Sequence, residues 1–184
     1  MARTEVATRD QLIEAAARIL AEDGIGALST RRLANELGVS TMVVYTRFGS
    51  MPELMDAVVA EGFDRQAASL DAVAETDDAS ADLVELGIAY RANALANPHL
   101  YTIMYAGNSE QQHRAHQAKE TNDRFTAAAA RALGSGLAAG MDPAALGEQV
   151  WSVVHGWVSL ELAGIVGVRD ADVDLRATLE RLLS

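Results

Sequence analysis

Apolar residues recur at helical spacing along nearly the whole chain of 184 residues. Leu12, Ala16 and Leu20 share one side of a helix near the N-terminus, and Leu175 and Leu179 do the same near the C-terminus. No segment alternates apolar and polar residues for long enough to predict a strand. The pattern therefore predicts an all-α protein of about nine helices, over residues 8–23, 30–37, 41–47, 51–74, 81–97, 98–106, 110–133, 143–166 and 172–183.

Capping residues support several of these helix starts. Thr8 and Gln11 have the spacing of a capping box, in which two side chains satisfy two free backbone N–H groups. Ser50 and Glu53 repeat the same spacing. Asp142 precedes a proline, as expected for an N-cap followed by the first helical residue.

Residues 28–54 predict two short helices joined by a tight turn. Gly38 ends the first helix, and we expect the Ser40 hydroxyl to cap the second by accepting a backbone N–H bond. Val44 and Phe48 form the inward side of the second helix. Its outward residues are small, hydroxyl-bearing or cationic, which suits insertion into a DNA major groove; they are Thr41, Met42, Val43, Tyr45, Thr46 and Arg47.

This stretch resembles the DNA-binding domain of the TetR family of bacterial transcriptional regulators. The resemblance covers roughly residues 8–60, and residues 151–164 also look like a late helix of some ligand-binding domains in the family. It is carried by Leu28, Ser29, Thr30, Leu33, Ala34, Leu37, Gly38, Val39, Ser40, Tyr45, Phe48, Ser50 and Leu54. It implies a helix-turn-helix domain over residues 1–50, a connecting helix over 51–74, and a helical ligand-binding and dimerisation domain over 75–184.

The resemblance also implies which residues contact DNA. The candidates are Thr30, Arg31, Ser40, Thr41, Met42, Val43, Tyr45, Thr46 and Arg47. The two threonines of the second helix can exchange hydrogen bonds with base edges, whereas Met42 and Val43 can pack on a thymine methyl. Ser40, Tyr45 and Arg47 suit phosphate contacts. The family usually has lysine where this chain has Met51, so one cationic phosphate contact is missing.

The C-terminal part is expected to bind a small-molecule effector. Aromatic and polar side chains that can line a cavity are Tyr90, Asn93, Tyr101, Met104, Tyr105, Trp151 and His155, with Trp157 as a further aromatic candidate. Core packing alone also explains each of these side chains. We expect no catalytic residues, because no nucleophile–base pair, carboxylate dyad or phosphate-binding loop stands out.

The run from Val150 to Val168 is almost wholly apolar. A membrane span is the simplest interpretation of such a run, but His155 and Glu161 interrupt it. A helix that is apolar on all sides is buried on several sides. The family's dimer mode, in which helices 143–166 and 172–183 of two copies form a four-helix bundle, supplies that burial. Gly156 and Gly164 can permit close helix approach.

Charge and composition narrow the function further. The net charge is −11, yet residues 1–50 carry six arginines against six acidic residues, so all of the excess negative charge lies beyond them. Cysteine is absent, which excludes disulfides and thiolate chemistry. His113, His116 and Glu120 have metal-ligand spacing, although a solvated helix face explains them better, and we expect no metal and no cofactor. No apolar leader is evident at the N-terminus, which favours a cytoplasmic protein.

The sequence therefore predicts a homodimeric regulator, a repressor, that binds a double-stranded DNA operator. A small-molecule effector in the C-terminal domain is expected to lower operator affinity. The alternative is a small-molecule sensor or interaction module that has lost DNA binding, which the missing lysine at Met51 and the negative net charge favour.

Overall fold

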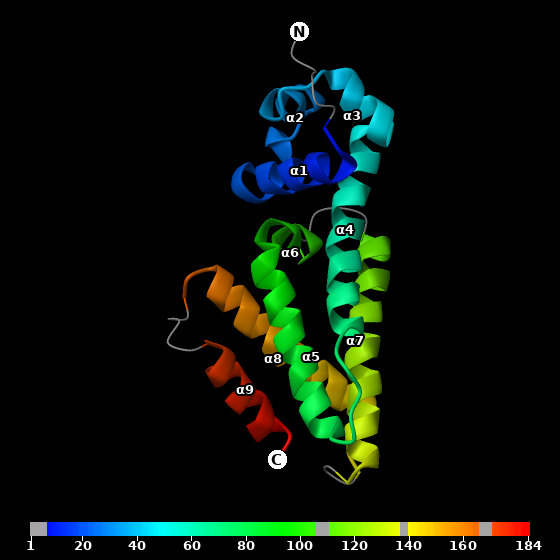
Figure 1. Cartoon of the computed structure of the whole chain (residues 1–184), viewed down its shortest axis with the longest axis vertical. Coiled ribbons are helices and arrows are strands. Elements are labelled where there is room, and N and C mark those ends of the chain that lie inside the picture. The colour runs from blue at the N-terminus through cyan, green and yellow to red at the C-terminus, as the bar shows by residue number, and fades with distance from the viewer. Residues whose placement is uncertain (1–6, 106–110, 137–139, 166–170) are drawn as a thin grey trace. The chain divides into compact units, whose positions relative to one another are not determined.

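The computed structural model describes residues 7–105, 111–136, 140–165 and 171–184. All regular structure within these residues is helical, which confirms the predicted fold class (Figure 1). The α-helices are α1 (Arg9–Asp23), α2 (Thr30–Glu36), α3 (Thr41–Phe48), α4 (Met51–Asp71), α5 (Ala79–Ala96), α6 (Pro98–Tyr105), α7 (Gln111–Gly134), α8 (Pro143–Leu162) and α9 (Ala171–Leu182), with a 3₁₀ turn at Ile25–Ala27.

The helices divide into two compact units. The N-terminal unit comprises Met1–Asp64 and Asn97–Ser109, and the C-terminal unit comprises Arg65–Ala96 and Glu110–Ser184. The first part of α4 belongs to the N-terminal unit and its last turns belong to the C-terminal unit. Helix α6 is part of the N-terminal unit although it follows α5 in the chain.

The start of α1 follows the predicted capping box. The Gln11 backbone N–H donates to the Thr8 hydroxyl at 3.2 Å, and the Thr8 N–H donates to the Gln11 side-chain oxygen at 2.8 Å. Leu12, Ile13 and Ile19 of this helix are buried. Helix α1 also packs against α6 within the N-terminal unit.

The turn between α2 and α3 depends on Gly38, whose φ of +65° lies in the left-handed region that favours glycine. Helix α3 then begins after Ser40, which holds the N-cap position. The predicted capping bond from the Ser40 hydroxyl is wrong, because this side chain forms no capping hydrogen bond. Val44 and Phe48 are buried as predicted and fix α3 to its own unit.

Close packing of α6 on α4 depends on Gly62. A Cβ atom added there would lie 2.6 Å from Cγ of Met104. Beside this contact, the Phe63 and Tyr105 rings meet edge-on at 5.8 Å, and the Tyr101 ring lies 5.1 Å from that of Tyr105. These aromatic contacts extend the core of the N-terminal unit.

Helix α5 lies at the centre of the C-terminal unit, where it contacts α7, α8 and α9. Leu83, Leu86 and Tyr90 of α5 are buried, as the helical pattern predicted. Helices α7 and α8 approach even more closely at Gly147. A Cβ atom there would lie 2.7 Å from the backbone N and Cα of Thr126, so only glycine fits this crossing.

Two predicted features of α8 are wrong. The helix ends at Leu162 rather than near residue 166, and Gly164 follows it with a φ of +68°. Gly164 therefore ends the helical path instead of permitting close helix approach. Helix α5 also starts two residues earlier than predicted, at Ala79. None of the helices in the described ranges is long and apolar enough to cross a bilayer.

Candidate nucleic-acid interface

The outer face of α3 presents most of the predicted DNA-binding side chains. Met42 is 68% exposed and Tyr45 is 50% exposed, although both are large and partly apolar. Thr41, Thr46 and Arg47 are exposed beside them, whereas Val43 is half-buried. Exposed side chains on one side of α3 and buried Val44 on the other are the arrangement expected of a helix that binds a groove.

Hydrogen bonds orient several of these side chains. The Thr30 hydroxyl at the start of α2 donates to the Tyr45 hydroxyl at 3.5 Å. Because the Tyr45 oxygen accepts this bond, its own proton remains directed to another acceptor. The Thr46 hydroxyl donates to the Met42 carbonyl at 2.8 Å, so its proton is engaged and its oxygen serves as an acceptor.

The arginines of the N-terminal unit fall into two groups. Arg31 and Arg47 are exposed and form no ion pair within the described part of the chain. The other described arginines are engaged: Arg9 pairs with Glu61 at 3.5 Å, Arg18 with Glu36 at 2.7 Å, and Arg32 with Asp23. The two unpaired arginines are those that the resemblance placed at DNA, so both keep their full charge for a phosphate or base.

The entrance to α4 departs from the predicted capping box. The Glu53 backbone N–H donates to the Ser50 hydroxyl at 3.3 Å, but the Ser50 N–H donates to the Phe48 carbonyl instead of the Glu53 side chain. Met51 is half-buried in the first turn of this helix. A thioether there cannot replace the cationic phosphate contact that a lysine makes.

Two of the predicted ligand-binding residues meet in the C-terminal unit. The hydroxyl of fully buried Tyr90 lies 3.0 Å from Nδ1 of His155. Burial lowers the pKa of His155, which favours the neutral imidazole. A neutral Nδ1 without a proton can accept the Tyr90 O–H, so the two groups satisfy each other.

A second polar pair joins α4 and α5 in the same unit. The Asn93 side-chain amide donates to Oε1 of Gln66 at 3.1 Å. Gln66 is fully buried and its Nε2 finds no hydrogen-bond partner. Sequence reasoning placed Gln66 in an apolar stripe and so did not identify it as a candidate; an amide within that stripe is the only signal available in the sequence.

The remaining predicted ligand residues are distributed between the two units. Tyr101, Met104 and Tyr105 lie on α6 in the N-terminal unit, where the first two are buried. Trp151 lies on α8, its ring is 6.2 Å from that of His155, and its indole N–H is buried without a partner. The Trp157 indole N–H is also buried without a partner. The side chain of His113, proposed with His116 as a metal ligand, lies outside the described residues.

A buried ion pair that sequence reasoning missed connects α5 and α8. Arg91 donates to the Glu161 carboxylate through Nε at 2.7 Å and through Nη2 at 2.5 Å. The two side chains are only 9% and 8% exposed. The bidentate geometry satisfies both buried charges, because a planar guanidinium matches both carboxylate oxygens.

Comparison with known sequences gives two matches that together span most of the chain. Residues 12–58 match the family described as "Bacterial regulatory proteins, tetR family". Residues 83–184 match the family described as "Tetracyclin repressor-like, C-terminal domain". A comparison with curated proteins gives no match.

Solved structures share the fold over nearly the full chain. A protein of unknown function from Rhodococcus sp. RHA1 is 26% identical, with 95% of this chain and 93% of that chain covered and a TM-score of 0.79. The TetR family transcriptional regulator PfmR from Thermus thermophilus is 22% identical, with 94% and 96% covered and a TM-score of 0.80. AmtR from Mycobacterium smegmatis is 20% identical, with 99% and 88% covered and a TM-score of 0.75.

The N-terminal match contains all of α2 and α3, and the C-terminal match covers more than half of the chain. The protein therefore belongs to the TetR family of DNA-binding transcriptional regulators, a family of non-enzymatic proteins.

Proposed function

We propose that the protein is a cytoplasmic, homodimeric repressor whose affinity for its DNA operator falls when a small-molecule effector binds the C-terminal domain. The observation that carries this proposal is the exposed face of α3 with two unpaired arginines, within a match to TetR regulators. Residues 1–50 form the DNA-binding domain of this proposal, 51–74 the connecting helix, and 75–184 the ligand-binding and dimerisation domain.

In the proposed complex, α3 of each protomer enters a major groove. Thr41, Met42, Val43 and Thr46 contact base edges, with Thr46 acting as an acceptor because its proton is engaged. The exposed Ser40 hydroxyl caps no backbone N–H, which leaves it available to a phosphate. Further contacts come from Thr30, Arg31, Tyr45 and Arg47. Twofold symmetry places the two half-sites ~34–36 Å apart along the duplex.

The dimer is proposed to form through α8 and α9. Leu160, at the end of α8, is 45% exposed, Ile165 follows at 71%, and Val173 of α9 is 57% exposed. A Cβ atom added at Gly156 would meet nothing within 4 Å in the single chain, so this part of α8 leaves room for another helix. Exposed apolar side chains of this kind favour association with a second copy.

The effector is proposed to act through unequal affinity for two conformations of the dimer. A ligand that prefers the conformation with unsuitable spacing of the two α3 helices lowers operator affinity by that preference. Buried polar groups in the C-terminal unit support a ligand-binding role, because the Gln66 Nε2 and Trp151 Nε1 donors lack partners there. Helix α4 is the proposed connection, since it contributes residues to both units.

The proposal is tested with a fluorescence-anisotropy titration of duplexes from the protein's own upstream region. The double variant Thr41→Ala/Tyr45→Phe is expected to lose roughly 10- to 100-fold in operator affinity, because a base contact and a phosphate contact are removed. Its unfolding curve stays unchanged, since both side chains are exposed. Thr102→Ala, an exposed change on α6, serves as the control.

Two results would contradict the proposal. One is that the unaltered protein shows no sequence-specific DNA binding even at low salt. The other is that light scattering gives the mass of a single chain at the concentrations used for DNA binding.

A further inference from the structure

A cavity of about 380 Å³ lies in the C-terminal unit, between the end of α4, the start of α5 and the second half of α7. Its volume falls in the range of small-molecule sites, about 300–1,000 Å³. None of the residues predicted from the sequence to bind ligand lines it. Its apolar lining consists of Leu70, Val73, Ala74, Leu86, Ala127 and Ala128.

One end of the cavity is closed by the guanidinium of Arg124. Its Nε and Nη2 donate to the Asp71 carboxylate at 2.6 Å and 3.0 Å, and its Nη1 donates to the Glu120 carbonyl at 3.3 Å. The hydrogen bond from Arg124 lowers the pKa of Asp71, so this acid stays ionised and paired. Arg124 therefore has no free nitrogen to offer a ligand.

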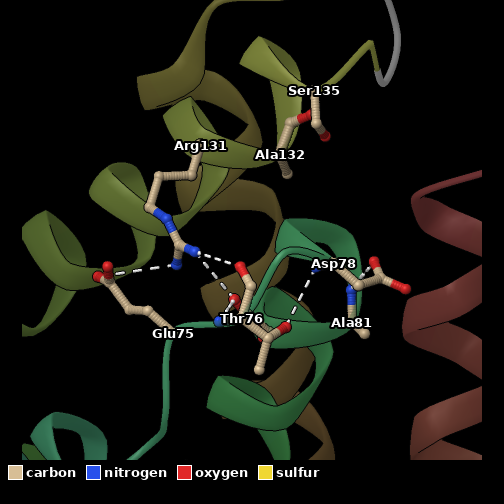
Figure 2. Close-up of polar contacts among 8 residues, drawn as sticks. Glu75, Thr76, Asp78, Ala81, Arg131, Ala132 and Ser135 are labelled. Atoms are coloured by element: carbon tan, nitrogen blue, oxygen red, sulfur yellow. Dashed lines mark hydrogen bonds and ion pairs between the residues drawn. The ribbon is translucent and has the colours of Figure 1, made fainter.

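The guanidinium of Arg131 at the other end is only partly satisfied (Figure 2). Its Nη2 donates to Asp82 at 3.0 Å and to the Thr76 carbonyl at 3.0 Å. Its Nη1 faces Glu75 at 3.6 Å, which is longer than a hydrogen bond, and the Glu75 side chain is 76% exposed. Within the described residues, neither Nε nor Nη1 of Arg131 forms a hydrogen bond.

The carboxylate of Asp82 cannot take over these free donors. It accepts bonds from the Thr76 backbone N–H at 2.8 Å and from the Thr76 hydroxyl at 2.7 Å as well as from Arg131, and its side chain is only 8% exposed. Glu75 is thus the group that an incoming anion would replace. That exchange costs little, because an exposed ion pair contributes at most about 1 kcal/mol.

We propose that this cavity binds a small organic acid, with its apolar body against Leu70, Leu86 and Ala127 and its carboxylate on Nε and Nη1 of Arg131. The inference deepens the effector part of the proposed function by naming a ligand class. It rests on that function only for the effect of the ligand on DNA. The lining also holds three acidic side chains against two arginines, so an organic cation is the competing ligand class that the test must separate.

Three probes with the same eight-carbon chain distinguish the ligand classes by calorimetry at pH 7 without DNA: octanoate, octanamide and octylamine. Octanoate is expected to bind, and octanamide to bind roughly 10- to 100-fold more weakly, because it loses a charge-assisted hydrogen bond. Equal affinity for octanoate and octanamide, tighter binding of octylamine, or no binding of octanoate would overturn the proposal.

Two pairs of exposed substitutions locate the site. Ala127→Leu fills the cavity and is expected to weaken octanoate binding at least tenfold, whereas Ala130→Leu, on the same helix but outside the cavity, leaves it unchanged. Glu75→Gln removes the competing carboxylate and is expected to tighten binding roughly two- to fivefold. Asp77→Asn makes the same change in net charge outside the cavity and serves as its control.

The same effect in both members of either pair would refute the location. Because these titrations contain no DNA, their outcome is independent of the operator experiment. Octanoate binding that leaves operator affinity unchanged would refute only the link to the proposed effector mechanism.

Discussion

His155 carries the most pH-sensitive contact that the structure shows in the neutral range. Its imidazole is half-buried and accepts the Tyr90 hydroxyl at 3.0 Å in the neutral form. Burial lowers its pKa in the folded protein below the ordinary 6.5, so the folded state resists protonation where the unfolded state does not. The unfolded chain therefore binds more protons as the solution becomes acidic.

This difference makes folding stability depend on pH with a defined sign. The His155 contribution is complete above pH 6.5 and is lost as pH falls below that value. His155→Gln is expected to flatten the decline in unfolding free energy between about pH 7.5 and 5.5, measured by urea titration at each pH. The lowered pKa values of Asp71 and Asp82 act only in more acidic solution, as pH falls below the ordinary carboxylate value of 3.8.

His116→Gln is the matched control for this prediction. His116 is exposed on α7 and is expected to leave the pH profile unchanged. Profiles that His155→Gln and His116→Gln alter equally would contradict the assignment to His155.

Single residues also show how far the sequence could predict the site. The outward side of α3 followed from spacing, because Val44 and Phe48 lie four residues apart and both are buried. The cavity beside Arg131 could not be predicted in this way. Three helices line it, its walls include alanines that resemble any helix surface, and the free donors of Arg131 depend on where Glu75 and Asp82 are placed.

Helix ends provide a sharper contrast between residues of the same chemical type. Thr8 accepts a capping bond at α1, whereas the Ser40 hydroxyl at the same position of α3 accepts none. A capping side chain stabilises a helix by typically ~1 kcal/mol, because it satisfies a backbone N–H that otherwise has no partner. The two helices therefore depend differently on their N-cap side chains.

Replacement by alanine is expected to separate these roles. Thr8→Ala lowers the free energy of unfolding by about 1 kcal/mol and leaves operator affinity unchanged. Ser40→Ala changes stability by no more than a few tenths of a kcal/mol, because no capping bond is lost, and weakens operator binding. Denaturant unfolding and anisotropy titrations measure the two effects. A stability loss for Ser40→Ala as large as that for Thr8→Ala would contradict the observed geometry.

The same contrast explains which helix ends the sequence predicted. Starts marked by Thr8 and Asp142 were correct, because each side chain accepts a bond from the third residue after it. The end of α8 was not, because its apolar pattern continues to Val168. The chain leaves the helix after Leu162, and Gly164 then takes a left-handed conformation that periodicity does not reveal.

Across the whole chain, charge separates the DNA-binding end from the rest. The net charge is −11, and residues 1–50 carry none of the excess. Residues beyond position 50 therefore repel the phosphate backbone while the N-terminal residues do not. Each cationic contact to phosphate changes the slope of log affinity against log salt by about 0.9, so cations missing from the interface can be counted.

Met51→Lys is expected to restore one such contact. Lysine in the first turn of α4 would raise operator affinity and steepen the salt slope by about 0.9. Met141→Lys adds the same charge at an exposed position of the C-terminal unit and is expected to leave the slope unchanged. Equal slopes for the two variants, measured by anisotropy over a range of salt concentrations, would show that Met51 does not face the duplex.

The crossing at Gly147 has a mechanical consequence for the C-terminal unit. Because the backbone of Thr126 occupies the space that a side chain would need, one step of α8 along α7 would bring Leu146 or Glu148 against that backbone. Sliding between these two helices is therefore blocked. A conformational change in this unit must carry α7 and α8 together, as a single lever.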